Sequence, residues 1–494
     1  IVGMGVITLY STTGCPHCRR AKDLLNKKNA KFTEINLSYN EQLRSQMVQL
    51  SGRTSVPQIF FNLDHIGGAD ELFQLEKDGL LDRLLRTLSE ASDLDEYSPW
   101  AKLKIIAAPD DVVMSAPEDS ADRKYSDLVH AMRNSETGLS IGVRKYHLRT
   151  YSRVFVGKEA VDWLIRQQKL TGGPATTRQA AVDIFNELLL AGFIHHCVHD
   201  HPFKDEELFY RFQADEDVPF LNGRKKWNDP ARDPLAITKE MRKRLDVLYA
   251  RHTILEDGNV TVNLNTLQED MEFENFEICA CELQTVEVEA MNTPSKLAFF
   301  INIYNVLTLH GHVVHGPPSS SYKRSWFFSN TCYNIGGHVL SLEDVEHGVL
   351  RGNRKSPGAI FRRFSSGDER TALSIPSDEI DPRIHLALNC GAKSCPPIRA
   401  YSTANIDAEL NLATQAFLEG VEVDSTAQSV TLSKIFSWYK SDFGSTDLEL
   451  LQWIQKHAPT KVAEQLGALL STCSPKTPKL KWALYDWTSA GVKK

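Results

Sequence analysis

The chain has 494 residues, of which 42% are hydrophobic and 24% are charged, and its formal net charge is −7. This length exceeds what one compact core supports, so we expect about three domains, and the acidic balance argues against a general nucleic-acid-binding protein. Nine cysteines, an odd number spread over so long a chain, do not indicate a disulfide scaffold, so we expect a reducing, cytoplasmic location.

The first predicted elements frame two cysteines that are separated by two residues. A strand-like run over residues 6–10 precedes Cys15 and Cys18, and a helix-like run over residues 19–25 follows them. Unpaired backbone N–H groups and the positive end of the helix dipole stabilise a thiolate at a helix N-terminus. Cys15 lies nearer that end, so we predict that it is the low-pKa nucleophile and that Cys18 resolves a mixed disulfide. A zinc site would need a second close pair of ligands, and the next cysteine is Cys197.

Two further motifs support thiol chemistry near these cysteines. Ser55, Val56 and Pro57 enter a predicted strand, where an X-Pro bond can be cis and expose the preceding backbone N–H and C=O to an extended peptide. Residues 67–70 read Gly-Gly-Ala-Asp, and their glycines allow close backbone approach. The acid, Asp70, can bind an amine at the start of the next predicted helix.

In order and spacing, the three motifs resemble the glutaredoxin family over about residues 5–88. The resemblance implies an α/β thioredoxin-like fold, glutathione as co-substrate, and disulfide or glutathionylated proteins as substrates, with no metal expected. It also implies that Val56 and Pro57 pair with the cysteinyl backbone of glutathione, and that Ala69 and Asp70 hold its γ-glutamyl end. The other predicted glutathione-binding residues are Thr12, Ser55 and Gly68.

The sequence departs from the family pattern at three positions. Thr12 stands where many glutaredoxins carry a lysine that helps to bind a glutathione carboxylate, Ser55 replaces a threonine, and His17 replaces the commoner tyrosine. If the loss of that lysine cripples glutathione use, the alternative function is a redox-sensing adaptor or scaffold with weak turnover.

Composition marks the predicted domain boundaries. The glutaredoxin-like domain spans residues 1–90, and an acidic, proline-containing linker spans 91–124. A second domain spans 125–213, a second linker spans 214–234, and the largest domain spans 235–490.

The second domain resembles the DEP domain in the order of its elements. Its strongest marks are Phe-Val-Gly at residues 155–157 and Val-Asp-Trp-Leu at 161–164. The family implies an α+β, winged-helix-like fold that docks on a membrane or on a signalling protein. Residues 137–158 contain no acid, and their basic residues, which we predict to bind lipid or a partner, are Arg144, Lys145, Arg149, Arg153 and Lys158. Against anionic lipid each contributes about 1 kcal/mol, although a solvated basic hairpin explains the stretch equally well.

A histidine-rich run at residues 195–201 contains potential metal ligands. On a strand His195, Cys197 and His199 would share one face. Polar loop residues also explain the run, and we favour that interpretation.

The C-terminal part contains three recognisable blocks. Residues 297–310 form a buried helix by apolar density, interrupted by Asn302 and Asn305, and no run reaches the roughly 18 apolar residues of a membrane span. Residues 333–348 indicate strand, turn, strand and helix, and residues 381–398 indicate a strand that enters a cysteine-bearing loop. With Tyr-Asp-Trp at 485–487, these blocks resemble the DUF547 family, whose function is unassigned, so we expect a mixed α+β domain of uncertain fold.

Two interpretations of the cysteine-bearing loop compete. In a thiol enzyme, Cys390 or Cys395 would be the nucleophile and His385 or His310 the base. In the other interpretation these groups are a buried, hydrogen-bonded core, and we favour this one. The most complete hypothesis is therefore a glutathione-dependent dithiol oxidoreductase joined to a localisation domain and to a C-terminal domain of unknown role. A second thiol-enzyme activity in the C-terminal domain is a further alternative.

Overall fold

The structure is a computed structural model of the chain. It describes residues 7–12, 15–37, 44, 47–48, 50–51, 53–61, 64–90, 121–146, 149–167, 177–197, 201–256, 259–489 and 491–494. Most of the predicted first linker, residues 91–120, lies outside the described residues.

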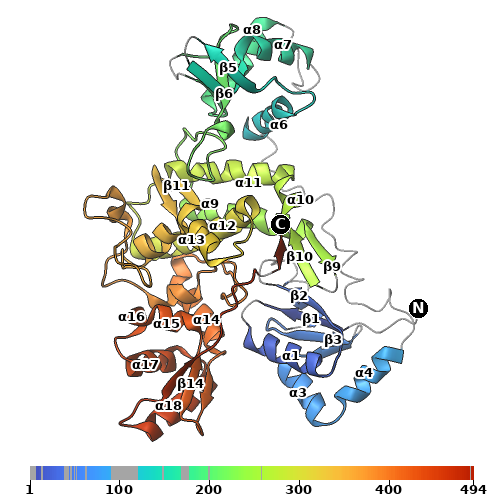
Figure 1. Ribbon diagram of the computed structural model, residues 1–494, viewed down its shortest axis with the longest axis vertical. Coiled ribbons are helices and arrows are strands. Elements are labelled where there is room, and N and C mark those ends of the chain that lie inside the picture. Colours follow the sequence, from blue (N-terminus) through green and yellow to red (C-terminus); the bar gives the residue numbers. More distant parts are fainter. Residues whose placement is uncertain are drawn as a thin grey trace.

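The N-terminal domain is built on a mixed sheet (Figure 1). Its strands are β1 (Ile7–Ser11), β2 (Thr33–Asn36), β3 (Gln58–Phe61) and β4 (Asp64–Gly67), in the order β2-β1-β3-β4. β1 runs parallel to β2 and antiparallel to β3, which pairs antiparallel with β4. Its helices are α1 (Pro16–Lys27), α3 (Ala69–Lys77) and α4 (Leu81–Glu90). This is the predicted α/β, thioredoxin-like arrangement, with a wholly buried central strand β1.

The sheet continues past β2 into the C-terminal domain (Figure 1). There β10 (Asn259–Asn263) pairs parallel with β2, with Asn259 opposite Glu34. On its other side β10 pairs with β9 (Thr253–Glu256) and with β16 (Val492–Lys493). The result is one seven-stranded sheet across the domain border. Pairing covers backbone groups that an edge strand would otherwise expose.

The second domain packs helices against a small antiparallel sheet. Its helices are α6 (Ala121–Arg133), α7 (Gly157–Arg166) and α8 (Arg178–Leu190). Its strands, in sheet order, are β5 (Gly142–Tyr146), β6 (Arg149–Val156), β8 (Phe209–Phe212) and β7 (Ile194–His196). Trp163, within the motif predicted to start a helix, is buried in α7 and donates its indole N–H to the Thr137 carbonyl at 2.7 Å. The domain is therefore α+β, as predicted.

The segment 214–234, predicted as a linker, is packed against the C-terminal domain. It begins within the short 3-10 helix η1 (Gln213–Asp215). The Asn222 side chain is fully buried and donates to the carbonyls of Ala280 at 3.1 Å and Asn334 at 2.8 Å. A buried amide must be paired, and this pairing fixes the segment in place.

The C-terminal domain surrounds one long helix. Its helical elements up to the cysteine-bearing loop are α9 (Pro234–Arg251), α10 (Leu264–Gln268), α11 (Met271–Cys281), η2 (Glu282–Thr285), α12 (Thr293–His315), α13 (Ser321–Asn330), η3 (Asp344–Leu350), η4 (Glu369–Leu373) and η5 (Pro382–Leu386). A two-stranded sheet pairs β11 (Cys332–Ile335) with β12 (His338–Ser341). The following elements are η6 (Thr403–Asn405), α14 (Ile406–Leu418), β13 (Glu422–Asp424), β14 (Ser429–Leu432), α15 (Lys434–Trp438), α16 (Lys440–Phe443), α17 (Asp447–His457), α18 (Thr460–Cys473) and β15 (Lys479–Trp482).

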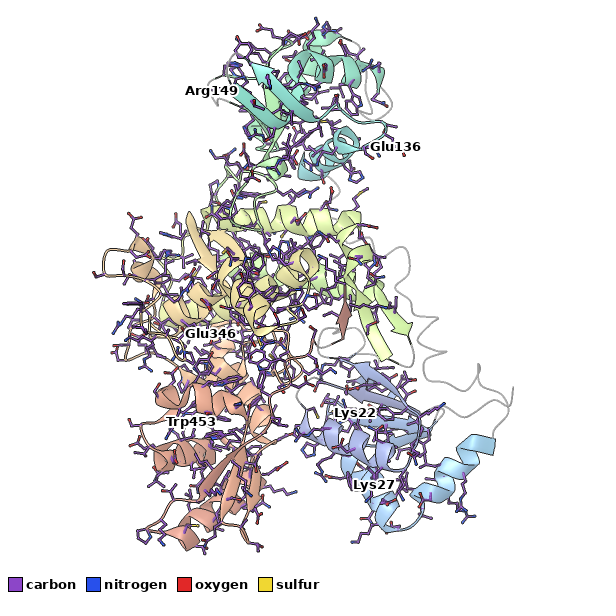
Figure 2. All side chains as sticks on the ribbon, in the orientation of Figure 1. Lys22, Lys27, Glu136, Arg149, Glu346 and Trp453 are labelled. Carbon is purple, nitrogen blue, oxygen red and sulfur yellow. The ribbon has the colours of Figure 1, made fainter. Side chains whose placement is uncertain are left out.

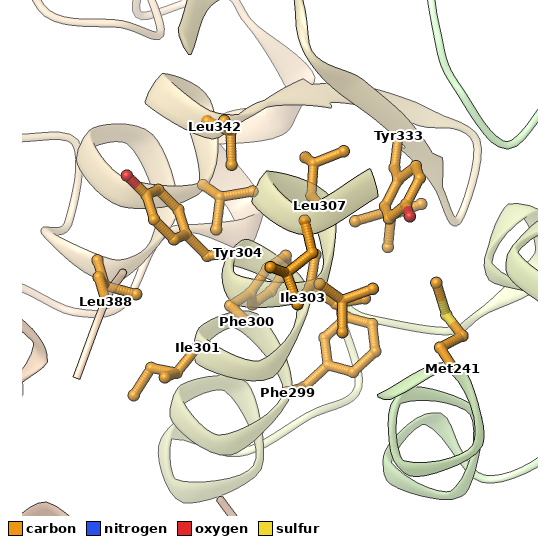
Figure 3. Packing of buried hydrophobic residues seen from close by; sticks show 14 of the residues in the cluster. Met241, Phe299, Phe300, Ile301, Ile303, Tyr304, Leu307, Tyr333, Leu342 and Leu388 are labelled. Atoms are coloured by element: carbon orange, nitrogen blue, oxygen red, sulfur yellow. The ribbon is translucent and has the colours of Figure 1, made fainter. Parts of the chain in front are cut away.

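Helix α12 is the predicted buried helix and the centre of the core. Asn292 caps its first turn, Pro294 follows the cap, and Gly316 ends it with a φ of 78°. Figure 3 shows its aromatic and aliphatic side chains packed against residues of α9 and β11. By length and composition α12 could cross a membrane, but 89% of the apolar window is buried inside the protein, as in the core helix of a folded domain.

One predicted element is wrong. Residues 382–386, expected as a strand, form the 3-10 helix η5. Asp381 accepts the backbone N–H of Arg383 at 2.9 Å, and Pro382 occupies the first helical position. A capping aspartate followed by proline favours a turn over an extended chain. The predicted strand, turn, strand and helix at 333–348 are confirmed, with reciprocal hydrogen bonds between Ser341 and Asp344 at the helix start.

Candidate active site

Cys15 caps helix α1 and Cys18 lies beneath it. The backbone N–H of Cys18 donates to Cys15 Sγ at 3.1 Å. A hydrogen bond from the Cys18 thiol lowers the pKa of Cys15; burial opposes this, and backbone N–H groups of Cys18 and His17 add to it. Burial raises the pKa of Cys18, which is 1% exposed, and the neighbouring Cys15 sulfur raises it further. The two thiols therefore differ in the direction that a nucleophile and a resolving thiol require.

The second motif lies against Cys15. The Val56–Pro57 peptide bond is cis, and the Val56 carbonyl lies 3.7 Å from Cys15 Sγ. The third motif borders the second, since a Cβ added at Gly68 would come within 3.3 Å of the Pro57 carbonyl oxygen. The structure thus brings all three sequence motifs together at one edge of the domain.

The remaining predicted glutathione-binding residues differ in exposure. Thr12 and Ala69 are buried, at 7% and 4% exposure, and the Thr12 carbonyl accepts the backbone N–H of Cys15 at 3.3 Å. Ser55 is exposed, and its carbonyl accepts the Gln58 side-chain amide at 3.0 Å. The Asp70 side chain is 83% exposed at the start of α3, 3.9 Å from Arg20. Of these residues, Ser55 and Asp70 are open to a ligand.

Sequence reasoning missed a pair of charged residues at this edge. Arg53 Nη1 lies 2.5 Å from Glu71 Oε1, and Glu71 Oε2 accepts the backbone N–H of Gly68 at 2.9 Å. Glu71 therefore fixes the loop that carries the third motif. The sequence contains a signal for the role of Glu71, because a glutamate three residues after a helix start has the spacing of a capping box.

The C-terminal domain contacts the cysteine motif from the other side. His17 Nε2 lies 3.7 Å from Glu419, and Arg19 lies 3.8 Å from Glu422. A Cβ added at Gly420 would come within 3.3 Å of Pro16. Just over 400 residues separate the partners in sequence, so no local pattern indicates this contact.

Comparison with known proteins matches the N-terminal domain to glutaredoxins. The glutaredoxin family model matches residues 7–66. Glutaredoxin 3 of Escherichia coli (strain K12) is 45% identical over 83 residues, which cover 17% of this chain and all of that protein. The chain belongs to the glutaredoxin family. Glutaredoxin of Pseudomonas aeruginosa is 43% identical over 82 residues, covering 17% of this chain and 98% of that protein.

One solved structure is that of glutaredoxin from Brucella melitensis. It is 45% identical, covers 18% of this chain and 91% of that chain, and has a TM-score of 0.16. That score carries no weight for the fold, which rests here on strand order and pairing.

Two other family models match further along the chain. Residues 138–212 match the domain found in Dishevelled, Egl-10 and Pleckstrin (DEP), and residues 288–418 match DUF547, a family of unknown function. The three domains therefore occur in the predicted order, and the glutaredoxin likeness supports thiol oxidoreductase activity in the N-terminal 17% of the chain.

Three of the five basic residues predicted to bind lipid or a partner are paired with acids. Arg144 lies 3.4 Å from Glu159, Arg153 lies 2.5 Å from Asp217, and Lys158 lies 3.7 Å from Glu207. The exposed residues Lys145 and Arg149 have no acidic partner among the residues that the structure describes. Figure 2 places Arg149 at the end of the molecule farthest from the glutaredoxin domain.

The histidine-rich run is partly described. His195 Nε2 lies 2.9 Å from Glu216, and Val198, His199 and Asp200 lie outside the described residues. In the described part of the chain, no group of three or more histidines, cysteines or acids is arranged to hold a metal ion.

Cys390 and Cys395 lie together in the C-terminal domain. Their sulfur atoms are 3.1 Å apart, and the Tyr485 hydroxyl lies 3.3 Å from Cys395 Sγ and 3.8 Å from Cys390 Sγ. The loop that carries them is fixed to α12, because Asn305 accepts the backbone N–H of Asn389 at 2.9 Å. Asn302 of α12 also holds the backbone of Tyr401, donating to its carbonyl and accepting its N–H.

The predicted histidines do not join this cysteine pair. His385 Nε2 lies 2.8 Å from Asp442, and its ring stacks on Tyr439 at 3.8 Å. His310 Nδ1 lies 2.8 Å from the Tyr333 hydroxyl. Within the described part of the chain, neither imidazole hydrogen-bonds a thiol, so the set of groups that a thiol hydrolase needs is not assembled.

Sequence reasoning also missed a buried charged network beside His385. The Asp442 carboxylate is fully buried and accepts from Arg351 at 2.7 Å and from Arg354 at 3.1 Å. Glu346, labelled in Figure 2, accepts from the Tyr439 hydroxyl at 2.5 Å. Burial acts to raise the pKa of Asp442, but hydrogen bonds from His385 and Arg351 outweigh it and lower that pKa. The network spans about 100 residues of sequence, which no short motif reveals.

Proposed function

We propose that the N-terminal domain is a dithiol oxidoreductase that uses glutathione as its reductant. The observation that carries the proposal is the placement of the two thiols. Cys15 Sγ accepts the Cys18 backbone N–H at 3.1 Å at the start of α1, and Cys18 is buried behind it. A helix N-terminus stabilises a thiolate, and a second thiol within reach can resolve the mixed disulfide.

The chemistry follows from these positions. The Cys15 thiolate attacks one sulfur of a substrate disulfide, and the other sulfur leaves as a thiolate that takes a proton from water. Cys18 then loses its proton and attacks Cys15 Sγ, which forms the Cys15–Cys18 disulfide and releases the reduced substrate. Two glutathione molecules return both cysteines to thiols and leave as glutathione disulfide. On a glutathionylated substrate Cys15 attacks the glutathione sulfur, and a second glutathione releases it, so one cysteine is enough.

The edge formed by the three motifs is the proposed glutathione site. The Val56 backbone beside Cys15 suits the cysteinyl part of glutathione, and the exposed Asp70 suits its α-amino group. Thr12 cannot supply the cation that many relatives have there. Arg53, exposed beside the loop of Gly68, offers a cation for a glutathione carboxylate.

The test is a glutathione-coupled reductase assay on the full chain. Cys15→Ser should abolish reduction of a protein disulfide and removal of glutathione from a glutathionylated peptide. Cys18→Ser should lose the first activity and keep the second, since the second needs one thiol. Cys197→Ser, which changes a partly exposed cysteine of another domain, is the matched control.

Labelling with iodoacetamide across pH checks the assignment of roles. Cys15 should titrate well below the value of about 8.5 for a free cysteine. Faster labelling of Cys18, or full reduction of the protein disulfide by Cys15→Ser, would contradict the proposal.

We also propose that the DEP domain docks on an anionic membrane, as a cytoplasmic, peripheral protein does. The proposal is supported by the β5–β6 hairpin, where Lys145 and Arg149 are exposed beside Val143 and Tyr146, at 63% and 59% exposure. Cations with neighbouring exposed apolar groups favour an anionic lipid surface. A signalling protein with an acidic face is the alternative partner.

Charge-reversal variants distinguish Lys145 and Arg149, which have no acidic partner among the described residues, from the basic residues that are paired with acids. The double change Lys145→Glu and Arg149→Glu should weaken binding to phosphatidylserine vesicles by about 30-fold or more, from about 1 kcal/mol per basic residue. The matched control, Arg153→Glu with Lys158→Glu, makes the same change in net charge at residues already paired with acids, and should bind nearly as wild type. Equal loss in both variants, or no binding by wild type at low salt, would refute lipid docking by this hairpin.

A further inference from the structure

The cysteine pair of the C-terminal domain is in direct contact. Cys390 Sγ and Cys395 Sγ are 3.1 Å apart, and the backbone N–H of Cys390 donates to Cys395 Sγ at 3.3 Å. A disulfide bond is about 2.05 Å long, so an approach of about 1 Å joins the sulfurs.

The loop is held in a shape that keeps the sulfurs together. The Asn389 side chain bridges the loop, accepting the Gly391 N–H at 2.7 Å and donating to the Pro396 carbonyl at 2.7 Å. Residues 486–488 hydrogen-bond the loop: the backbone N–H groups of Lys393 and Ser394 donate to the carbonyls of Thr488 and Asp486, and the Ser394 hydroxyl accepts the Asp486 backbone N–H at 2.8 Å. The loop therefore holds the two sulfurs within reach of each other.

The two thiols differ in access and acidity. Cys390 is partly exposed, and Cys395 is 1% exposed. The hydrogen bond to Cys395 raises the pKa of Cys390, and burial raises it further. Burial acts to raise the pKa of Cys395 too, but hydrogen bonds from the Cys390 thiol, the Tyr485 hydroxyl and backbone N–H groups outweigh it and lower that pKa. The contact between the two sulfurs thus favours the thiol form of Cys390 and the thiolate form of Cys395.

This environment suits disulfide exchange and not acyl transfer. A thiol hydrolase needs an imidazole to shuttle a proton to its leaving group, and both His385 and His310 hydrogen-bond elsewhere. Disulfide exchange needs only an accessible sulfur, a base and a second thiol in reach. Cys390, the partly exposed cysteine, provides the attacking sulfur, and Cys395 provides both the base and the second thiol.

We propose that Cys390 and Cys395 form a second redox-active dithiol, which closes to a reversible disulfide by exchange with glutathione disulfide. The site is distinct from Cys15 and Cys18 and goes beyond the function proposed for them. Cys390 Sγ attacks one sulfur of glutathione disulfide while its proton passes to Cys395 Sγ, and one glutathione leaves as a thiolate. The Cys395 proton then moves to that thiolate, and Cys395 Sγ attacks Cys390 Sγ and expels the second glutathione. One thiol and one thiolate become a disulfide, and one glutathione disulfide becomes one glutathione thiol and one glutathione thiolate, which takes a proton from water.

The proposal is tested by equilibrating the full chain in buffers of set glutathione to glutathione disulfide ratio. Samples are quenched in acid, alkylated and digested with trypsin, which cuts after Lys393 and so separates the two cysteines. The oxidised pair appears as two peptides joined by a disulfide. We expect a single two-electron transition that reverses when glutathione is added back. Cys395→Ser should lose the cross-link and leave Cys390 carrying one glutathione.

Matched controls separate this site from general oxidation and from the first site. The buried Cys332 and Cys473 should stay reduced, and so be recovered in alkylated form, at every glutathione ratio. Cys15→Ser should reach the same cross-linked end point, because the pair exchanges with glutathione disulfide directly. The proposal is overturned if Cys390 and Cys395 stay free at every ratio, or if Cys390 gains glutathione and no cross-link follows in the wild-type chain. A failure of the Cys15 assays with an intact cross-link would refute only the function proposed for the first site.

Discussion

We expect two buried histidines, His312 and His347, to make the C-terminal domain less stable in acid. His312 lies in α12, 2% exposed, with its ring 5.2 Å from that of Phe327. Burial lowers its pKa to about 4. Burial also lowers the pKa of His347 to about 4, with Glu346 opposing the shift and Arg351 adding to it.

The sign and size of the effect follow from linkage. An unfolded histidine has a pKa of about 6.5, so below that pH the histidine of the unfolded chain binds a proton. The same histidine in the folded chain stays neutral until a lower pH. The stability contributed by each neutral histidine is present above pH 6.5 and is lost as pH falls from there through about 4. At pH 5 the loss is about 2 kcal/mol per histidine and about 4 kcal/mol for both. That is a large part of a typical unfolding free energy of about 5–15 kcal/mol.

Urea unfolding followed by tryptophan fluorescence measures this loss. Six of the eight tryptophans lie at or after Trp227 and none lies before Trp100, so the signal reports mainly on the C-terminal part. The change His312→Gln removes one titrating group, and the difference in unfolding free energy between pH 7.5 and pH 5 should shrink by about 2 kcal/mol. His130→Gln, at a half-exposed histidine of the DEP domain, is the control for loss of a histidine outside the core. The reasoning is refuted if His312→Gln retains the wild-type difference, whatever its stability at pH 7.5.

Two further predictions concern charges that the fold places by long-range contact. Asp442→Asn should lower the unfolding free energy by about 3–5 kcal/mol in the same urea assay, because it leaves the buried Arg351 without its anion; a loss below about 1 kcal/mol would contradict this. Glu419→Gln should shift the iodoacetamide titration of Cys15 to lower pH, since the Glu419 carboxylate acts to raise that pKa. Glu136→Gln in the distant DEP domain (Figure 2) is the control, and an equal shift in both variants would remove the assigned cause.

Local chemistry made the first site predictable from sequence. The strand, Cys15, the helix and the two later motifs each have a short pattern with a physical reason, and the structure brings them to one edge. The same holds for α12, whose apolar density indicates burial, and for Ser341 and Asp344, whose spacing indicates a helix start. In each case the cause lies within a few residues of its effect.

The contacts that the sequence did not reveal join residues that are far apart in the chain. The Tyr485 hydroxyl reaches Cys395 across 90 positions, and Asp442 reaches His385 across 57. No periodicity reports such contacts, and neither the closeness of His385 to the cysteines in sequence nor the packing of an apolar helix that carries His310 shows which side chains meet. The predicted strand at 382–386 failed for a different reason, because an aspartate cap and a proline outweighed its apolar residues.

The C-terminal domain contacts the cysteine motif, and an isolated N-terminal domain would lack this contact. Gly420 lies so close to Pro16 that a Cβ would come within 3.3 Å, and Glu419 places a carboxylate 3.7 Å from His17. The parallel pairing of β2 with β10 adds a second connection between the same domains. An isolated fragment of residues 1–90 would lack both, and its Cys15 would lose the carboxylate that opposes thiolate formation. The Cys15 pKa should therefore be lower in the fragment than in the full chain, and the iodoacetamide titration of the two measures that difference.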